Sequence, residues 1–557
     1  MRCGNWDDAH RLPSNDVGGV WAGVAVAISW RVVLRRGLPD VAGLALAFVH
    51  GLPSLAYRLG HDQAMFFYIG REWLHGRIPY RDAFDVKPPG IYAVYALSIA
   101  LFGERLWAPR LLELFAVLGM GACVAYAIRR DRPIRPGEIG LGAMLVSSFY
   151  FANLDHWDTA QSEFWEALFL IGAVCAVERS DSRRTGGLVG GALVACAVLF
   201  KPTAAVVGLV VLLMALARGW APNEGPTAAR VRRAALAGAW CVVGGSAVLG
   251  LFLGYFAAHG ALHHLSEFLG YMRQYRSWPS GEPAALNAQI FWLFRGGLWT
   301  AFWIASAAIA CLEVRGRKAH GVLRGIGWAL ALSLASVESI AMQGKWLWYH
   351  WGVVTPFVAM LGMYGLSELA RPRIRNAMIV GTALLLAGFY SSPRWISNNN
   401  HTYQSFTRDV VWEWIHGRLT DAALSEVFRI GGSYNYRVNE SVALHIRARA
   451  RSGDTMHVRS YEPTLYVIAG LRTPTRWPSE YPLEQPGLEY HRAEWIAERD
   501  RVLWSALPRF IVTYADRLDD IADIERHGYH EMYREAMFVV MERNQSSALP
   551  AARGPVP

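Results

Sequence analysis

The residues best suited to chemistry stand in a polar loop between apolar runs, from position 60 to position 92. Asp62 opens this loop, and Lys87 lies near its end, immediately before a rigid Pro-Pro pair. Charge beside or within a membrane is costly, so an acid-rich loop between apolar runs is expected to be functional. Asp62 offers a general base, and Lys87 offers a cation for an anion at the bilayer surface. Without a function, Asp62 would be a helix cap, and Lys87 would be an ordinary lysine that extends its charge from the membrane into water.

A second acidic loop, Asn153–Glu166, leads directly into an apolar run. Glu163 falls in the first turn of the helix that this run predicts, where capping and the helix dipole explain a carboxylate. Glu166 lies deeper on the same helical face, where a charge costs about 3 kcal/mol or more. Its position implies a wet or protein-lined cavity, or a protonated side chain.

Later loops supply cations. Lys201 stands at the tip of a tight hairpin, and Lys345 and His350 lie in the tryptophan-rich stretch Gln343–Trp351. Aromatic residues form belts at membrane interfaces, but their faces also suit a sugar ring, and lysine supplies a point charge to phosphate. The side chains expected to contact a sugar or an acceptor are Asp85, Asp158, Trp348 and Tyr349.

Carboxylates and cations on one face of a helix bundle suit attack on a phosphate-linked group carried by a lipid. The carboxylate takes the hydroxyl proton of the acceptor, and the cations stabilise the departing phosphate. The sequence shows neither a Gly-rich phosphate loop nor a dinucleotide-binding motif. A nucleotide-dependent reaction is therefore not indicated.

Membrane spans must position these loops. Of the 557 residues, 53% are hydrophobic and 18% are charged, whereas soluble proteins carry about 25% charged residues. Apolar windows of about 20 residues, enough to cross a hydrocarbon core of ~30 Å, recur up to position 391. The fold class is thus a polytopic α-helical membrane protein of about 11 or 12 spans. The predicted spans are 38–57, 109–128, 138–153, 163–178, 186–200, 202–217, 234–258, 290–311, 325–342, 350–370 and 377–391.

Arginine-rich loops all fall on one side of these spans, which the positive-inside rule assigns to the cytoplasm. The loops that hold the candidate residues then face outward, as does the chain after residue 391. Two apolar segments do not fit this alternation of inner and outer loops. Residues 17–34 are either an extra span or an interfacial helix, and residues 91–103 are a re-entrant or interface-lying helix. The helix after Asp62 is expected to lie on the outer surface.

After residue 394 the sequence alternates predicted helices with short apolar strands, which indicates a small soluble α/β domain. The expected strands are 455–460, 509–514 and 537–541, and the expected helices are 441–451, 491–506 and 518–527. The predicted organisation is a cytoplasmic or interfacial segment (1–37), a transmembrane catalytic bundle (38–394) with an outer loop (58–90), and an extracytoplasmic domain (395–557).

Charge and cysteine content exclude other classes. The net charge is +10, but the basic residues are spread over short loops, which argues against nucleic-acid binding. The cysteines show no CxxC motif and no Cys/His ligand spacing, so neither a disulfide framework nor a zinc site is indicated.

The loop motifs resemble a known family. Asp62 with the helix after it, then Gly76-Arg77-Ile78-Pro79-Tyr80-Arg81-Asp82 and Asp85-Val86-Lys87-Pro88-Pro89, resembles the first outer loop of GT-C fold membrane glycosyltransferases. The motifs are similar to those of bacterial protein-mannosyltransferase-like and aminoarabinose-transferase-like enzymes, which implies a place in the bacterial cytoplasmic (inner) membrane. The resemblance continues at Ser162-Glu163, Phe200–Thr203, Gly344–Pro356 and in the tail.

That family transfers a sugar from a polyprenyl-monophosphate donor in the membrane, usually with inversion, so an envelope lipid, glycan or protein is the expected acceptor. The resemblance implies that Asp62 is the catalytic base, Lys87 a ligand of the donor phosphate and Glu163 a second catalytic acid. Lys201, Lys345 and His350 are further phosphate ligands. The familiar acidic pair is Asp62-Gln63 here, which leaves one carboxylate. No cofactor is predicted, and a divalent metal is not indicated.

Two other functions stay open. A transporter or lipid-carrier flippase would line a pathway with intramembrane Glu113, Glu166, Arg295 and Glu338. Against it, the sequence has no repeated halves with matching broken helices, and its polar motifs gather on one face. Alternatively, the tail is the working part and the bundle its anchor.

Overall fold

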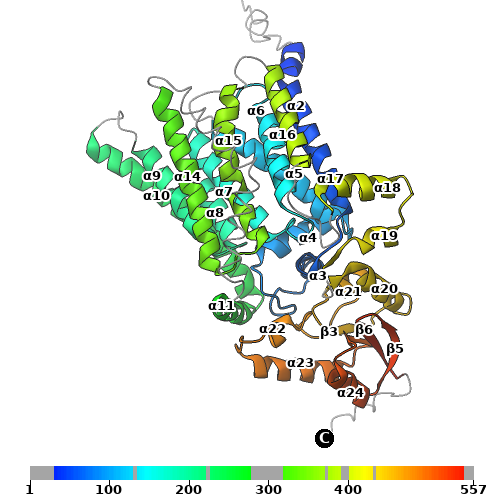
Figure 1. The fold of residues 1–557 in the computed structure, drawn as a ribbon. Helices are drawn as coiled ribbons and strands as arrows, with labels where there is room; N and C mark the ends of the chain where they lie inside the picture. Colours follow the sequence, from blue (N-terminus) through cyan, green and yellow to red (C-terminus); the bar gives the residue numbers. More distant parts are fainter. Residues whose placement is uncertain are drawn as a thin grey trace, which may run out of the picture.

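The computed structural model describes residues 30–128, 134–220, 226–277, 318–369, 374–390, 401–430 and 434–544. A helical bundle forms its larger part, and a small α/β domain caps one end of the bundle (Figure 1). The polytopic helical fold with a C-terminal domain is thus confirmed. The predicted span 290–311 and most of the segment 17–34 lie outside the described residues.

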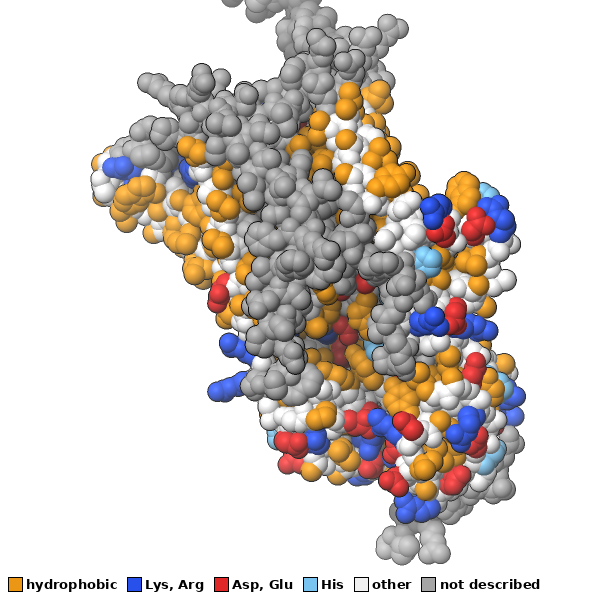
Figure 2. Space-filling view, in the orientation of Figure 1, with side chains coloured by type: hydrophobic (Ala, Val, Ile, Leu, Met, Phe, Trp, Pro, Cys, Tyr) orange, Lys and Arg blue, Asp and Glu red, His pale blue; other side chains and the backbone are white. Residues whose placement is uncertain are grey.

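The bundle helices match the predicted apolar runs. They are α2 (Trp30–Gly51), α5 (Ala108–Ala127), α6 (Glu138–Asn153), α7 (Ser162–Arg179), α8 (Arg183–Val198), α9 (Ala204–Gly219), α10 (Thr227–Ala258), α14 (Lys318–Gln343), α15 (Thr355–Leu369) and α16 (Ile374–Tyr390). In the described part of the chain, four helical stretches are long and apolar enough to cross a membrane: Gly37–Ala56, Ala108–Ala127, Thr227–Ala258 and Gly321–Gln343. Hydrophobic side chains cover the visible flanks of the bundle, whereas charged ones gather on the C-terminal domain (Figure 2).

The candidate loops and Arg218 lie at opposite ends of the bundle. At one end, Arg218 donates to the backbone carbonyls of Val177 and Ser180, close to the C-terminus of α7. Cations at helix C-termini are favoured by the helix dipole. The opposite end holds the start of α7, the hairpin between α8 and α9, the end of α14 and the C-terminal domain (Figure 1). The loops with the candidate residues therefore share one end.

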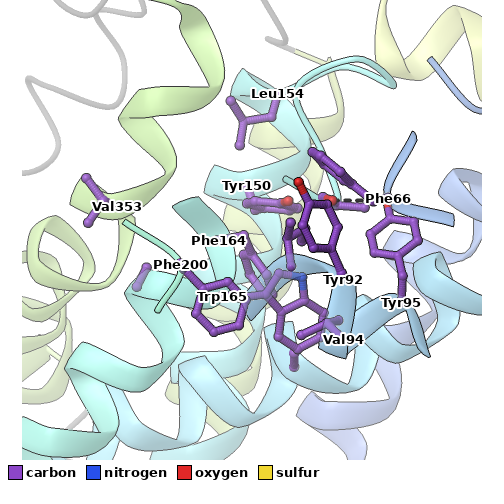
Figure 3. Packing of buried hydrophobic residues seen from close by; sticks show 14 of the residues in the cluster. Phe66, Tyr92, Val94, Tyr95, Tyr150, Leu154, Phe164, Trp165, Phe200 and Val353 are labelled. Atoms are coloured by element: carbon purple, nitrogen blue, oxygen red, sulfur yellow. Dashed lines mark hydrogen bonds between the residues drawn. The ribbon is translucent and has the colours of Figure 1, made fainter. Parts of the chain in front are cut away.

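Helix α3 (His61–Leu74) does not lie on an open surface as predicted. Residues 63–72 are all buried, because α4 (Gly90–Phe102) packs against α3 and α21 (Thr464–Ala469) of the C-terminal domain also contacts it. The sequence prediction was wrong because the amphipathic pattern does not show that a distant domain covers the polar face. Figure 3 shows the aromatic cluster that joins α3 and α4 to α6 and α7, with Phe66, Tyr92, Tyr95, Tyr150, Phe164 and Trp165.

Helix α4 occupies the segment predicted to be re-entrant or interfacial. Its 13 residues span about 20 Å, which is less than the hydrocarbon thickness of ~30 Å. Leu97 and Leu101 on this helix are exposed. The helix is therefore shorter than a full membrane span and carries exposed apolar side chains.

The C-terminal domain has a four-stranded sheet in the order β3 (Met456–Arg459), β4 (Phe510–Tyr514), β6 (Phe538–Arg543) and β5 (Tyr529–Glu535). Strands β3 and β4 are parallel, and the other pairs are antiparallel. Helices α20 (Tyr436–Arg447), α23 (Arg492–Ala506) and α24 (Leu518–Arg526) coincide with predicted helices, and α22 (Tyr481–Glu484) is a further short one. Strand β5 was missed because its polar, largely exposed residues carry no apolar run.

One arginine ties the domain to the bundle. Arg476 pairs with Glu267 on α11 (Leu262–Ser277) at 2.8 Å and with Glu498 on α23 at 2.8 Å. Its carbonyl oxygen accepts a hydrogen bond from the backbone N–H of Phe84 at 2.6 Å. The same residue therefore links the outer loop, the bundle and the tail.

Replacing Arg476 by methionine is expected to destabilise the protein by roughly 2–4 kcal/mol, because it leaves two carboxylates facing each other in a poorly solvated interface. Thermal unfolding of the detergent-solubilised protein, followed by tryptophan fluorescence, measures this. Arg534→Met removes the exposed pair with Glu531 on β5 and is the control, with an expected loss below about 1 kcal/mol. Equal melting temperatures for the two variants would contradict the proposed role of Arg476.

Candidate active site

The first two predicted residues, Asp62 and Lys87, form an ion pair. Asp62 stands in the first turn of α3, and Lys87 precedes the Pro-Pro pair at the start of α4. Lys87 Nζ lies 3.1 Å from Asp62 Oδ2, with side chains only 11% and 17% exposed. The hydroxyls of Tyr80 and Tyr92 both donate to the Lys87 carbonyl, at 2.8 and 2.9 Å. These two bonds hold the loop that presents the lysine.

Every described contact of the Asp62 carboxylate comes from a hydrogen-bond donor. Tyr461 donates its hydroxyl to Oδ1 at 3.1 Å, and Gln161 donates its amide to Oδ2 at 3.3 Å. Burial alone would raise the pKa of Asp62, but the charge of Lys87 and the hydrogen bonds from Lys87 and Tyr461 lower it below its ordinary value. Asp62 is therefore ionised at neutral pH, as a base must be.

Lys87 also meets Tyr349, one of the predicted sugar or acceptor contacts. Its Nζ lies 3.3 Å from the Tyr349 hydroxyl and 4.8 Å from the centroid of that ring. Burial opposes the charge of Lys87, but Asp62 and Tyr349 raise its pKa well above the ordinary value. Lys87 is thus a permanent cation beside Asp62.

Asp85 lies next to this pair, with Oδ2 bonded to the hydroxyl of Tyr92 at 2.8 Å. Burial raises the pKa of Asp85 to about 6, against the hydrogen bond from Tyr92, and the charge of Asp62 adds to the rise. Two neighbouring carboxyl groups therefore have opposite shifts, with Asp62 held ionised and Asp85 nearer to neutral.

Glu163 is the centre of a second cluster. Its Oε1 lies 2.8 Å from Lys201 Nζ and 3.4 Å from His350 Nε2, and its side chain is 1% exposed. His350 Nδ1 donates to the carbonyl of Lys345 at 2.6 Å, which directs Nε2 toward Glu163. The short segment η2 (Trp348–Val354) carries His350 at the start of α15. The structure thus brings two later loops together around one carboxylate.

Lys345 is affected by the positive charges of both clusters, Lys87 in the first and Lys201 in the second. It is 5% exposed, and its Nζ lies 3.4 Å from the ring centroid of Tyr275 on α11. Burial, and then the positive charges of Lys87 and Lys201, lower the pKa of Lys345 to about 7. Three lysines therefore converge on one polar region, and one of them titrates near neutral pH.

We expect the binding of a lipid phosphodiester to weaken as pH rises from 6 to 8. Lys345 is charged below its pKa of about 7, so it attracts the phosphate at pH 6 and loses that charge at pH 8. A phosphodiester is the right probe, because a monoester itself titrates near a pKa of about 6. The change, measured by titration in nanodiscs, should be at least about threefold. In Lys345→Met the affinity should be lower and flat with pH, and an unchanged slope would refute the assignment.

The remaining predicted contacts lie at the edges of this region. Asp158 is buried in the turn that precedes α7. It is one of several charged residues near the Tyr57 hydroxyl, with Asp155 and Arg110. Trp348 is half-buried at the first position of η2. Glu166 is fully buried one turn along α7 from Glu163, and its carboxylate has no hydrogen-bond partner among the described residues.

Gln63, which replaces the second acid of the familiar motif, has a clear structural role. Its amide nitrogen lies 2.9–3.1 Å from the carbonyl oxygens of His156, Trp157 and Thr159, and its oxygen accepts from the Gly60 N–H at 3.1 Å. A carboxylate here would face three carbonyl oxygens without a proton to donate. Gln63 therefore fastens α3 to the loop before α7 and places Gln161 against Asp62.

The structure adds residues that the sequence did not suggest. Gln161 and Tyr461 contact Asp62, Tyr275 lies against Lys345, and Tyr461 is 399 positions from Asp62 in the chain. No local pattern marks a tyrosine in a soluble tail as a neighbour of a membrane loop. Among the residues that the structure describes, no three His, Cys, Asp or Glu side chains are placed to hold a metal ion.

Comparisons with known proteins bear on the fold of the chain. Residues 86–238 match the model of the dolichyl-phosphate-mannose-protein mannosyltransferase family. ArnT from Cupriavidus metallidurans bound to undecaprenyl phosphate is 19% identical, with a TM-score of 0.55 over 91% of this chain and 98% of the other. The apo state of ArnT gives 17% identity and a TM-score of 0.56 over 90% and 97%. A search of curated protein sequences gave no significant match. The chain therefore has the ArnT-like GT-C fold, and the predicted resemblance to mannosyltransferase-like and aminoarabinose-transferase-like enzymes is confirmed.

Proposed function

We propose that this protein transfers a sugar from a polyprenyl-monophosphate donor to an envelope acceptor at the outer face of the bacterial cytoplasmic membrane. The observation that carries the proposal is the buried Asp62–Lys87 pair, with a base and an anion ligand 3.1 Å apart. Support comes from the family match and from the similar ArnT structure, which was solved with undecaprenyl phosphate.

In the proposed reaction, the donor phosphate binds Lys87 and draws it away from Asp62. The freed Oδ2 accepts the proton of the acceptor hydroxyl, and the acceptor oxygen attacks the anomeric carbon of the sugar. The bond from that carbon to the phosphate oxygen breaks as the new bond forms, which inverts the anomeric centre. Asp62 holds the proton, and polyprenyl phosphate leaves with the electron pair.

Cations balance the charge that develops on the leaving phosphate. Lys87 is the direct ligand, and Lys345 and Lys201 add positive charge nearby, whereas burial lowers the pKa of His350 and keeps its ring neutral. Glu163 holds Lys201 at 2.8 Å and so fixes its direction. We propose that this set of side chains makes a metal unnecessary, and that Tyr349 and Trp348 contact the sugar or the acceptor.

The transporter alternative gains no support from the intramembrane charges. Glu113 pairs with Arg110 at 3.7 Å and receives the hydroxyl of Tyr150, whereas Glu338 is exposed on the flank of α14. Arg295 lies outside the described residues. Buried Glu113 is thus held in a local network rather than facing a shared pathway.

The test uses the full-length protein in nanodiscs with a panel of undecaprenyl-phosphate-linked hexoses and pentoses and an envelope extract as acceptor. Release of undecaprenyl phosphate together with label in the extract is the expected result. Mass spectrometry of envelope glycans in a deletion strain identifies the missing sugar. Movement of lipid-linked sugar across proteoliposomes without any transfer would overturn the proposal.

A further inference from the structure

The C-terminal domain contacts the proposed base directly. Tyr461 lies between β3 and α21, and its hydroxyl donates to Asp62 Oδ1 at 3.1 Å. The next residue, Glu462, is fully buried, with Oε1 3.0 Å from His61 Nε2. Two consecutive residues of the tail therefore pair with two consecutive residues at the start of α3.

The tyrosine is held in place from several sides. The other carboxylate oxygen of Glu462 accepts from the Asn439 amide at 2.7 Å, which fixes the backbone beside Tyr461. The Tyr461 ring lies 4.6 Å from the His61 ring and 4.9 Å from the Tyr481 ring, measured between centroids. The hydroxyl of Tyr481 in turn lies 3.2 Å from that of Tyr275, the residue beneath Lys345. The Tyr461 hydroxyl thus has a single direction, toward Asp62.

The hydrogen bond from Tyr461 fixes the rotation of the Asp62 carboxylate. With Oδ1 taken by Tyr461, Oδ2 is the oxygen that faces Lys87 and Gln161. An aspartate has a broad terminal torsion, and Lys87 leaves Asp62 when a donor phosphate arrives in the proposed reaction. After Lys87 leaves, Tyr461 on Oδ1 at 3.1 Å and the longer contact from Gln161 on Oδ2 at 3.3 Å remain, and the bond from Tyr461 leaves Oδ2 free to face the acceptor.

We propose that Tyr461 is a positioning residue that fixes the Asp62 carboxylate from the C-terminal domain, so that this domain completes the active site. The inference rests on the proposed function of Asp62. The hydrogen bond also contributes to the lowered pKa of Asp62, after the effects of burial and Lys87. Loss of the hydroxyl should therefore change both the rate and its dependence on pH.

The experiment compares two variants that keep the ring: Tyr461→Phe, and 4-aminophenylalanine introduced at position 461. The first removes the donor, and the second replaces O–H by N–H. Tyr461→Phe should lower kcat by about 10-fold to 100-fold with an unchanged donor KM. The acidic limb of its pH–rate profile should move up by about one pH unit, because the carboxylate loses a donor that stabilised its charge. The amino variant should recover most of the rate and the original limb.

Tyr434→Phe is the matched control. Tyr434 also belongs to the tail, and its hydroxyl donates to the carbonyl of Leu59, two positions before His61. This variant removes a bond between the domains without touching Asp62, so its melting temperature should fall while its pH–rate profile keeps the wild-type limb.

The outcomes separate the two proposals. If Asp62→Asn is inactive but Tyr461→Phe keeps the wild-type kcat and pH profile, the positioning role is wrong and the proposed function stands. If both ring-preserving variants unfold, Tyr461 has a structural role and the inference also fails. Normal transfer by Asp62→Asn, measured on the same undecaprenyl-phosphate sugar, would exclude Asp62 as the base and with it the positioning role of Tyr461, whereas absence of transfer by the wild type would refute the proposed function itself.

Discussion

Replacing Asp62 by asparagine is expected to reduce turnover by about 10³-fold. Asparagine has nearly the same shape and still accepts the hydroxyl of Tyr461, but it cannot take a proton from the acceptor. Binding of undecaprenyl phosphate should not weaken. It should become slightly tighter, because Lys87 no longer has to leave a carboxylate at 3.1 Å. Initial rates of undecaprenyl phosphate release and a binding titration measure the two quantities.

Asp82→Asn is the matched control from the same loop. Asp82 pairs with Arg81 at 2.7 Å and accepts from the Ile78 N–H at 2.7 Å. Its removal affects loop geometry but not the base, so we expect a rate within about threefold of the wild type. Near-normal turnover in Asp62→Asn, or an equal loss in both variants, would exclude Asp62 as the base.

Replacing Lys87 by methionine is expected to raise the donor KM by roughly 30-fold to 100-fold, because a charged hydrogen bond to phosphate is lost. Methionine keeps the apolar volume against Tyr349. The same loss should appear in the affinity for undecaprenyl phosphate, which is measurable without any acceptor. Lys87→Arg retains the cation and should lose less.

The Asp62→Asn, Lys87→Met double variant tests whether the two residues act as a pair. In the wild type, phosphate binding breaks the ion pair, whereas in Asp62→Asn that pair is already absent. Lys87→Met should therefore weaken phosphate binding more in the Asp62→Asn background than in the wild type. Strictly additive effects on binding would show that phosphate does not draw Lys87 away from Asp62.

The sequence predicted the parts of the fold that depend on local pattern. Apolar runs located the bundle helices, and alternating helices and strands located the C-terminal domain, because both patterns arise from burial of one face or of a whole segment. Strand β5 and the burial of α3 were missed, since each depends on what packs against it. The polar face of α3 looks solvated until the tail covers it.

The residues of the candidate site also fall into two groups: those that a local pattern predicts, and those that depend on contacts with distant parts of the chain. Asp62 and Lys87 belong to one loop, so residue type and the family resemblance were enough to select both. Glu163, Lys201 and the Lys345–His350 stretch come from three separate loops, and only the alternation of inner and outer loops along the spans predicted that they share one face. Tyr461 and Gln161 carry no signal of their own. Gln63 looked discordant because its three carbonyl partners belong to a loop 93–96 positions away.

The clamp between His61-Asp62 and Tyr461-Glu462 also has a consequence for biogenesis. The two pairs are separated by 399 and 401 positions, so the ribosome finishes the whole bundle before the clamp can form. In the proposed orientation, the tail must also cross the membrane before it folds. If Asp62 and Tyr461 act as proposed, a newly inserted bundle is slow until its last domain has folded against α3.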